Sequence, residues 1–178
     1  MPKESVVEIP SGSGNKYRYV YDPANRATKY LGPVGDSPDL GEQEFMNLFN
    51  LNMNYQERDK IIFGKVLDWD AKIPPSGSFT DLSAADLQLL LDKNFIEADE
   101  TQNFSPSTED FLDFMKRYPR TTAHGYAISP KRDDYRVTLE GVEIPGPCSG
   151  DEIVAFSNAY GHADDFRVGE DSCFAWWD

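Results

Sequence analysis

The alternation of hydrophobic and polar residues is clearest over 124–144, where it predicts a β-hairpin. Tyr126 and Ile128 share one face of the first strand, and Val137 and Leu139 share one face of the second. Because successive side chains of a strand point to opposite faces, these residues are expected to pack into a core. The pattern therefore predicts an antiparallel sheet.

The alternation of the second strand shifts by one position after Glu140. A β-bulge at Gly141 restores the phase, so that Val142 and Ile144 also face the core. Glycine adopts an unusual backbone conformation more easily than other residues, which makes Gly141 the expected site of the bulge.

Helix-capping patterns surround the hairpin. Ser83, Ser107 and Ser149 are each followed three positions later by an acidic residue and then by apolar residues at helical spacing, so a helix is expected to start at each of them. A second, shorter hairpin is predicted over 165–177. The order ααββαββ over residues 81–178 predicts an α+β fold, in which an antiparallel sheet of two β-hairpins packs against amphipathic helices.

The amino-terminal part is expected to contain a small antiparallel β-meander followed by helices. In its middle strand Tyr17, Tyr19 and Tyr21 share one face, while Lys16 and Arg18 lie on the other. We therefore expect one packed aromatic face and one charged, solvated face. The predicted elements are strands at 6–9, 16–21 and 27–31 and helices at 41–50 and 54–67.

A run of turn-forming residues starts at Pro74 and suits neither a helix nor a central strand. Residues 74–80 are therefore predicted to be a linker between two parts. Residues 1–73 form the meander with its two helices, and residues 81–178 form the α+β domain.

The chain is strongly acidic. Its 178 residues contain 17 Lys and Arg against 31 Asp and Glu, for a net charge of -14. This charge opposes nonspecific binding to nucleic acid or to anionic lipid. No stretch is apolar enough for a signal peptide or a membrane helix, so a cytoplasmic location without a membrane partner is expected. In that reducing compartment Cys148 and Cys173 are expected to be free thiols.

Histidine and cysteine side chains are the candidates for metal or thiol chemistry. His124, Cys148, His162 and Cys173 are a valid set of zinc ligands, but they are spread along the chain and not in the close pairs of most zinc sites. No metal, cofactor or catalytic residue is therefore predicted. Cys148 is the better thiol candidate because it lies just before a predicted helix, although a surface thiol beside a helix cap is the simpler interpretation.

Lys131 and Arg132 form a basic tip on the predicted hairpin. Two helices followed by a basic hairpin resemble a winged-helix arrangement, which favours nucleic acid as a partner. Two features weigh against it. The net charge has the wrong sign, and the helix that would enter the groove begins with Glu109 and Asp110, which would repel phosphates.

Trp176 and Trp177 are the other candidate binding residues. Adjacent residues in a strand face opposite sides of a sheet, so either the sheet is covered on both faces or one indole is exposed. An exposed indole would be a natural anchor for a partner chain.

These observations lead to three hypotheses, because no motif in the chain identifies a reaction. The first is a noncatalytic protein-interaction module that binds another protein or itself. The alternative is a nucleic-acid-associated, winged-helix-like protein that uses the basic hairpin. The third is a small metal-binding protein or thiol-dependent enzyme built on the cysteines and histidines.

Overall fold

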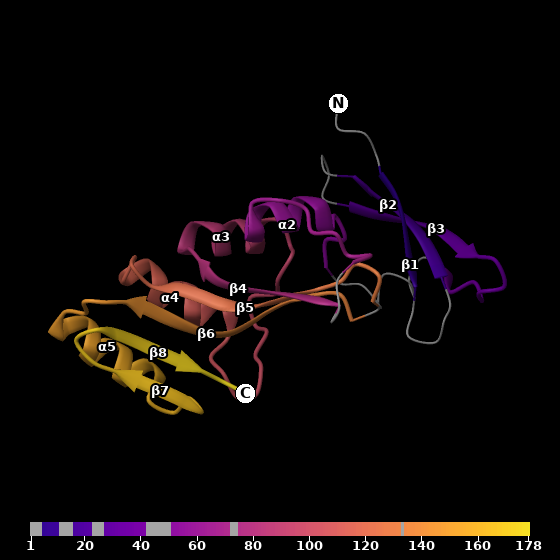
Figure 1. Ribbon diagram of the computed structural model, residues 1–178. Coiled ribbons are helices and arrows are strands. Elements are labelled where there is room, and N and C mark those ends of the chain that lie inside the picture. Colours follow the sequence, from indigo (N-terminus) through magenta and orange to yellow (C-terminus); the bar gives the residue numbers. More distant parts are fainter. Residues whose placement is uncertain (1–4, 11–15, 23–26, 42–50, 72–74, 133) are drawn as a thin grey trace. The chain divides into compact units, whose positions relative to one another are not determined.

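A computed structural model describes residues 5–10, 16–22, 27–41, 51–71, 75–132 and 134–178 (Figure 1). These residues form four helices and two antiparallel sheets, so the predicted α+β fold class is confirmed. The chain divides into two compact units, each built from segments that are not adjacent in sequence. Unit 1 contains Met1–Gly77, Lys93–Phe95 and Ala127–Arg136, and unit 2 contains Ser78–Asp92, Ile96–Tyr126 and Val137–Asp178.

The larger sheet contains both predicted hairpins. Its strands are β4 (Ser76–Leu82), β5 (Thr122–Ile128), β6 (Val137–Pro145), β7 (Asp165–Val168) and β8 (Ser172–Trp176), in the order β4-β5-β6-β8-β7. The last strand, β8, pairs with β6 on one side and with β7 on the other. Both of its edges are therefore occupied, and a second copy of the chain finds no free edge of β8 to pair with.

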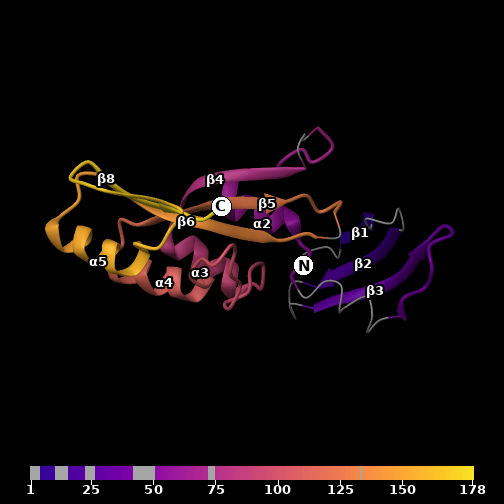
Figure 2. The same ribbon diagram turned by 90° about the horizontal axis from the view of Figure 1, so that it is seen from below.

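Three helices cover one face of this sheet (Figure 2). They are α3 (Ala84–Asp92), α4 (Thr108–Arg117) and α5 (Gly150–Tyr160). Each starts at its predicted serine: the hydroxyls of Ser83, Ser107 and Ser149 accept the backbone N–H three residues later at 3.1 Å. Ser149 and Glu152 form a complete capping box.

The core of unit 2 lies between these helices and the sheet. Trp177, which follows β8, is 1% exposed, and its indole meets the rings of Phe111 and Tyr160 edge-on at centroid distances of 5.6 and 5.8 Å. From the sheet side, Val142 and Ala175 lie opposite each other and are fully buried. Aromatic side chains from two helices and the chain end thus fill one continuous core.

The change of phase predicted at Gly141 is present, but the reason for glycine differs from the one expected. Leu139, Val142 and Ile144 are all buried, as the change of phase requires. The backbone of Gly141, however, is not among those with positive φ. A Cβ atom at this position would lie 2.0 Å from the carbonyl oxygen of Ala175 and 2.6 Å from Nε2 of His124. Lack of space, and not backbone conformation, therefore requires glycine here.

The amino-terminal meander of unit 1 is confirmed, with strands β1 (Ser5–Pro10), β2 (Lys16–Asp22) and β3 (Ala27–Val34) in that order. Tyr17 and Tyr19 are buried while Lys16 and Arg18 are exposed, as predicted; the side chain of Tyr21 lies outside the described part. The two tyrosines pack with Met53 and Tyr135, and the hydroxyl of Tyr19 donates to the backbone oxygen of Met53 at 3.0 Å.

The helix of unit 1, α2 (Tyr55–Phe63), starts after the predicted cap, Asn54, but stops short of the predicted end. Gly64 adopts the left-handed conformation at φ 73° and donates its N–H to the carbonyl of Lys60 at 3.0 Å, which ends the helix. The helix expected over 41–50 falls, apart from Gly41, outside the described residues.

A buried ion pair lies at the centre of unit 1. Arg58 and Asp59 are both fully buried, and the guanidinium contacts the carboxylate at 2.9 Å. Arg58 lies over the rings of Trp69 and Tyr135 at 5.4 and 4.6 Å, and its Nη1 donates to the carbonyl of Ile128 at 2.8 Å. Asp59 accepts the indole N–H of Trp69 at 2.7 Å. The charges are thus paired and hydrogen-bonded, which is the condition for burying them.

The segment predicted to be a linker contains most of a strand. β4 begins at Ser76, and its Gly77 and Phe79 are buried while Ser78 and Thr80 are exposed. The two units of the structure are also not two consecutive stretches of chain, unlike the predicted parts 1–73 and 81–178. The division into residues 1–73, a linker and residues 81–178 stays a prediction.

Candidate functional site

The two terminal tryptophans point to opposite faces of the larger sheet, as expected for neighbours in an extended chain. Trp177 points to the helices and is buried, whereas Trp176 lies on the other face and is partly exposed. Trp177 is therefore a core residue, and Trp176 is the indole available at the surface.

Five side chains define the face that carries Trp176, which we call the open face: Glu140, Glu143, Arg167, Phe174 and Trp176. Strand register places Trp176 opposite Gly141 and sets Phe174 between Glu143 on β6 and Arg167 on β7. Glu140 is assigned to this face because its carboxylate accepts a hydrogen bond from the Trp176 side chain. The three helices of this unit lie on the opposite side of the sheet (Figure 2).

Phe174 is the centre of a three-layer stack on the open face. Its ring lies parallel to that of His124, with centroids 5.1 Å apart and planes at 3°. On this same ring the guanidinium of Arg167 lies 4.4 Å from the centroid, in the geometry of a cation–π contact. The stack holds Phe174 in one orientation, and the exposed Arg167 also forms an ion pair with Asp165 at 3.3 Å.

His124 is the buried layer of this stack. The side chain is 7% exposed, and burial lowers its pKa to about 4, so the imidazole is neutral near pH 7. Its Nε2 finds no hydrogen-bond partner among the described residues. Because the ring is closed in by Phe174 and Gly141, His124 serves here as a packing residue.

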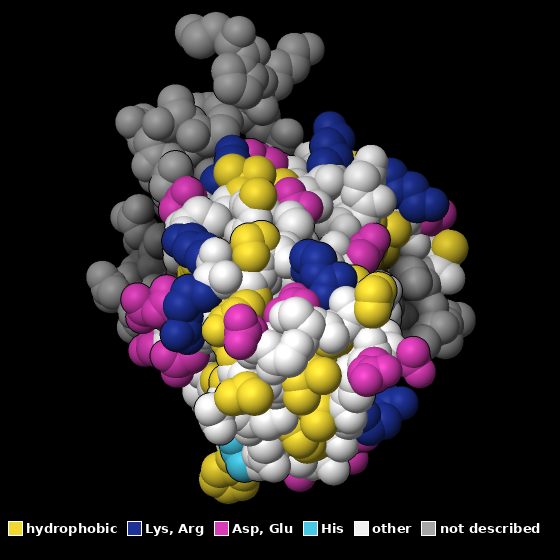
Figure 3. Space-filling model, turned by 90° about the vertical axis from the view of Figure 1, so that its left-hand side faces the viewer, with side chains coloured by type: hydrophobic (Ala, Val, Ile, Leu, Met, Phe, Trp, Pro, Cys, Tyr) yellow, Lys and Arg dark blue, Asp and Glu magenta, His cyan; other side chains and the backbone are white. Residues whose placement is uncertain are grey.

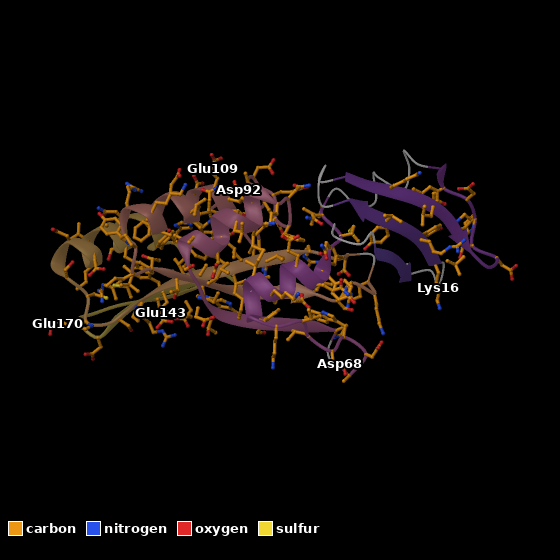
Figure 4. All side chains as sticks on the ribbon, turned by 90° about the horizontal axis from the view of Figure 1, so that it is seen from above. Lys16, Asp68, Asp92, Glu109, Glu143 and Glu170 are labelled. Atoms are coloured by element: carbon orange, nitrogen blue, oxygen red, sulfur yellow. The ribbon has the colours of Figure 1, made fainter. Side chains whose placement is uncertain are left out.

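Glu140 is a carboxylate of the open face whose pKa is raised. Burial raises its pKa, the charge of Asp178 raises it further, and a hydrogen bond from the Trp176 side chain opposes both effects. Glu140 and Glu143 form no ion pair with any described residue. Glu143 is labelled in Figure 4. The open face therefore presents partly desolvated negative charge beside aromatic rings.

The predicted basic tip lies in unit 1, and its cations are paired. Lys131 forms an ion pair with Asp70. Arg132 and Arg136 both bind Asp134, at 2.6 and 3.1 Å, and the contact with Arg132 is the largest cause of the lowered pKa of that carboxylate. The ion pairs compensate the positive charge that a phosphate backbone would need.

The surface at the α5 end of the larger sheet shows mixed charge. On the described residues of the face in Figure 3, basic and acidic side chains are interspersed and hydrophobic ones are scattered between them. Among the described residues, no helix is long and apolar enough to cross a bilayer.

The four candidate metal ligands do not assemble into one site. Cys148 and Cys173 are both free and lie near each other: Cys173 is opposite Ile144 in the strand pairing, and the Cys148 thiol donates to the backbone oxygen of Ile144 at 3.6 Å. His124 stacks on Phe174, which points away from Cys173 in β8, and His162 contacts the ring of Trp177 at 5.3 Å. Within the described ranges, no three His, Cys, Asp or Glu side chains are grouped as metal ligands.

Sequence reasoning missed the surroundings of Cys148. The Arg120 guanidinium binds the carboxylate of Glu152 at 2.7 Å and the backbone oxygens of Pro145 and Pro147 at 3.1 and 2.7 Å, which brings it next to Cys148 in the chain. The capping pattern identifies Glu152, but no local pattern links it to an arginine 32 positions earlier.

Comparison of the chain with protein-family models, with curated proteins and with solved structures gives no match. Any functional conclusion therefore has to rest on the geometry described above.

Proposed function

We propose that the protein is a noncatalytic protein-interaction module whose open face binds a partner segment with basic and apolar side chains. The observation that carries this proposal is a sheet face on which Trp176 and Phe174 are partly exposed beside Glu140 and Glu143, two carboxylates that form no ion pair with any described residue. Tryptophan is enriched among the residues that anchor protein interfaces.

The negative charge of the open face favours a partner with basic side chains. A carboxylate whose pKa is raised by burial and by a neighbouring negative charge gains most from an incoming cation, and Glu140 is in this position. The net charge of -14 also attracts cationic partners over a distance. A lysine or arginine of the partner would pair with Glu140, while its apolar neighbours would cover Trp176.

A second copy of the chain is the less favourable partner. Two identical open faces would bring Glu140 and Glu143 of each copy close to those of the other, and like charges across an interface repel. Neither edge of β8 is available for strand pairing between copies.

Nucleic acid is the alternative partner, and the ion pairs of the hairpin tip weigh against it. Replacement of Lys131 and Arg132 by Glu tests it. If nucleic acid binds there, a fluorescent oligonucleotide should bind the wild type in a salt-dependent manner and lose affinity for the double variant.

Selection from a random peptide library displayed on phage tests the proposal directly. Peptides enriched on the wild-type protein should contain Lys or Arg next to apolar residues, and synthetic copies should bind about tenfold or more weakly to Trp176→Ala and to Glu140→Gln. Phe104→Ala is the matched control, because this side chain is 96% exposed but lies outside the open face.

Two results would count against this function. One is a library that yields no enriched peptide. The other is a set of enriched peptides that bind Trp176→Ala and Glu140→Gln as tightly as they bind the wild type, which would place the interaction elsewhere. Native mass spectrometry of the unliganded protein completes the test, because a stable dimer would make a second copy the partner.

A further inference from the structure

Cys148 and Cys173 are brought together by the backbone at the end of β6. Cys173 of β8 lies opposite Ile144 of β6, and the thiol of Cys148 contacts the carbonyl oxygen of Ile144 at 3.6 Å. The backbone N–H of Cys148 donates to the carbonyl of Glu170 at 2.8 Å. Glu170, labelled in Figure 4, lies in the turn between β7 and β8. Strand pairing and this hydrogen bond therefore position the two thiols independently of each other.

The two thiols differ in how accessible they are. Cys148 is partly exposed and Cys173 is fully buried. Burial, together with the nearby Cys148, raises the pKa of Cys173 to about 11. A reagent in solution therefore reaches Cys148 first, while Cys173 stays protonated behind it.

A fixed positive charge lies next to the accessible thiol. The guanidinium of Arg120 binds the backbone oxygen of Pro147, the residue before Cys148, at 2.7 Å and is held in place by Glu152 and the backbone oxygen of Pro145. A cation near a sulfur stabilises the negative charge that sulfur carries during thiol–disulfide exchange. A partly exposed thiol, a buried thiol brought near it by Ile144 and a neighbouring cation are the parts that such exchange needs.

We propose that Cys148 and Cys173 form a reversible intramolecular disulfide, with a low-molecular-weight disulfide as the oxidant. Cys148, as its thiolate, attacks one sulfur of the oxidant, which forms a mixed disulfide and releases one thiolate that takes up a proton. Cys173 then loses its proton and attacks the sulfur of Cys148, which releases the second thiol. Two protein thiols are oxidised, one small disulfide is reduced to two thiols, and the two protons pass to those thiols. This modification site does not depend on the function proposed for the open face.

Incubation of the wild-type protein with oxidised glutathione, followed by alkylation of remaining thiols and mass spectrometry, tests the proposal. The protein mass should fall by two hydrogen atoms, proteolysis should yield one peptide pair linked through Cys148 and Cys173, and dithiothreitol should reverse both changes. Cys173→Ala should instead keep glutathione attached to Cys148. Cys148→Ala should stay unmodified, because its remaining thiol is buried.

Circular dichroism of the variants shows whether they are folded, and the wild-type result stands if one is not. Two unmodified thiols in the wild type would overturn the proposal. A glutathione adduct that persists at Cys148 in the wild type, or a disulfide between two chains, would overturn it equally, since each shows that Cys173 does not resolve the mixed disulfide within the chain.

Discussion

The carboxylate of Asp59 pairs with the guanidinium of Arg58 inside unit 1, where both side chains are fully buried. The pair is held by further hydrogen bonds, from the Trp69 indole to Asp59 and from Arg58 to the carbonyl of Ile128. Removal of one charge would leave the other buried without a partner, which is far more costly than loss of an exposed ion pair.

We therefore expect Asp59→Ala to lower the free energy of unfolding by about 3–5 kcal/mol, measured by urea denaturation. Asp134→Ala is the matched control. It removes the partner of Arg132 and Arg136, whose side chains are 47% and 35% exposed, and should cost about 1 kcal/mol. Equal losses in the two variants would show that the buried pair contributes no more than a surface pair.

Trp177 and Trp176 should respond differently to truncation, because only the first is a core residue. Trp177→Ala removes a side chain that contacts Phe111 and Tyr160, so the free energy of unfolding should fall by about 3–5 kcal/mol. Trp176→Ala loses a hydrogen bond to Glu140 at the surface and should cost about 1 kcal/mol. Thermal unfolding of both variants measures the difference, and a larger loss in Trp176→Ala would reverse the assignment of the two faces.

Gly141→Ala tests the close approach of Gly141 in β6 to the backbone of Ala175 in β8. The new methyl group would lie 2.0 Å from a backbone oxygen of β8, so strands must move apart, and we expect a loss of about 3 kcal/mol. Gly150→Ala adds the same group where nothing lies within 4 Å and should change stability by less than about 0.5 kcal/mol. Chemical denaturation of the two variants provides the comparison; a tolerated Gly141→Ala would contradict the close packing of β6 on β8.

Local patterns were sufficient to predict most helices and strands. Ser107 and Ser149 cap helices because the capping interaction spans only three residues, and alternation identified β6 because one of its faces is buried. β4 was missed because Phe79 and Leu82 are its only large apolar residues and turn-forming residues surround its start.

The candidate sites depend on contacts that no local pattern reports. Burial of Trp177 follows from the packing of α4 and α5, and the stack on Phe174 requires β5, β6, β8 and β7 to be neighbours in that order. The proximity of Cys148 to Cys173 likewise depends on the register of β6 on β8. Alternation showed that the two tryptophans face opposite sides, but only the arrangement of the helices decides which side is covered.

Stability should depend on pH through His124. Its pKa is lowered from 6.5 to about 4 in the folded protein, so between these values the unfolded chain binds a proton that the folded chain does not. Above pH 6.5 this difference does not lower the free energy of unfolding. As the pH falls from 6.5 towards 4, the free energy of unfolding decreases by up to about 3 kcal/mol. His124→Gln should remove this part of the pH dependence, whereas His162→Gln, at an exposed position, should retain it. Urea denaturation of the three proteins at several pH values measures the effect. If the free energy of unfolding of the wild type changed with pH in the same way as that of His124→Gln, the imidazole would be taking up its proton inside the folded protein. That result would contradict its burial under Phe174.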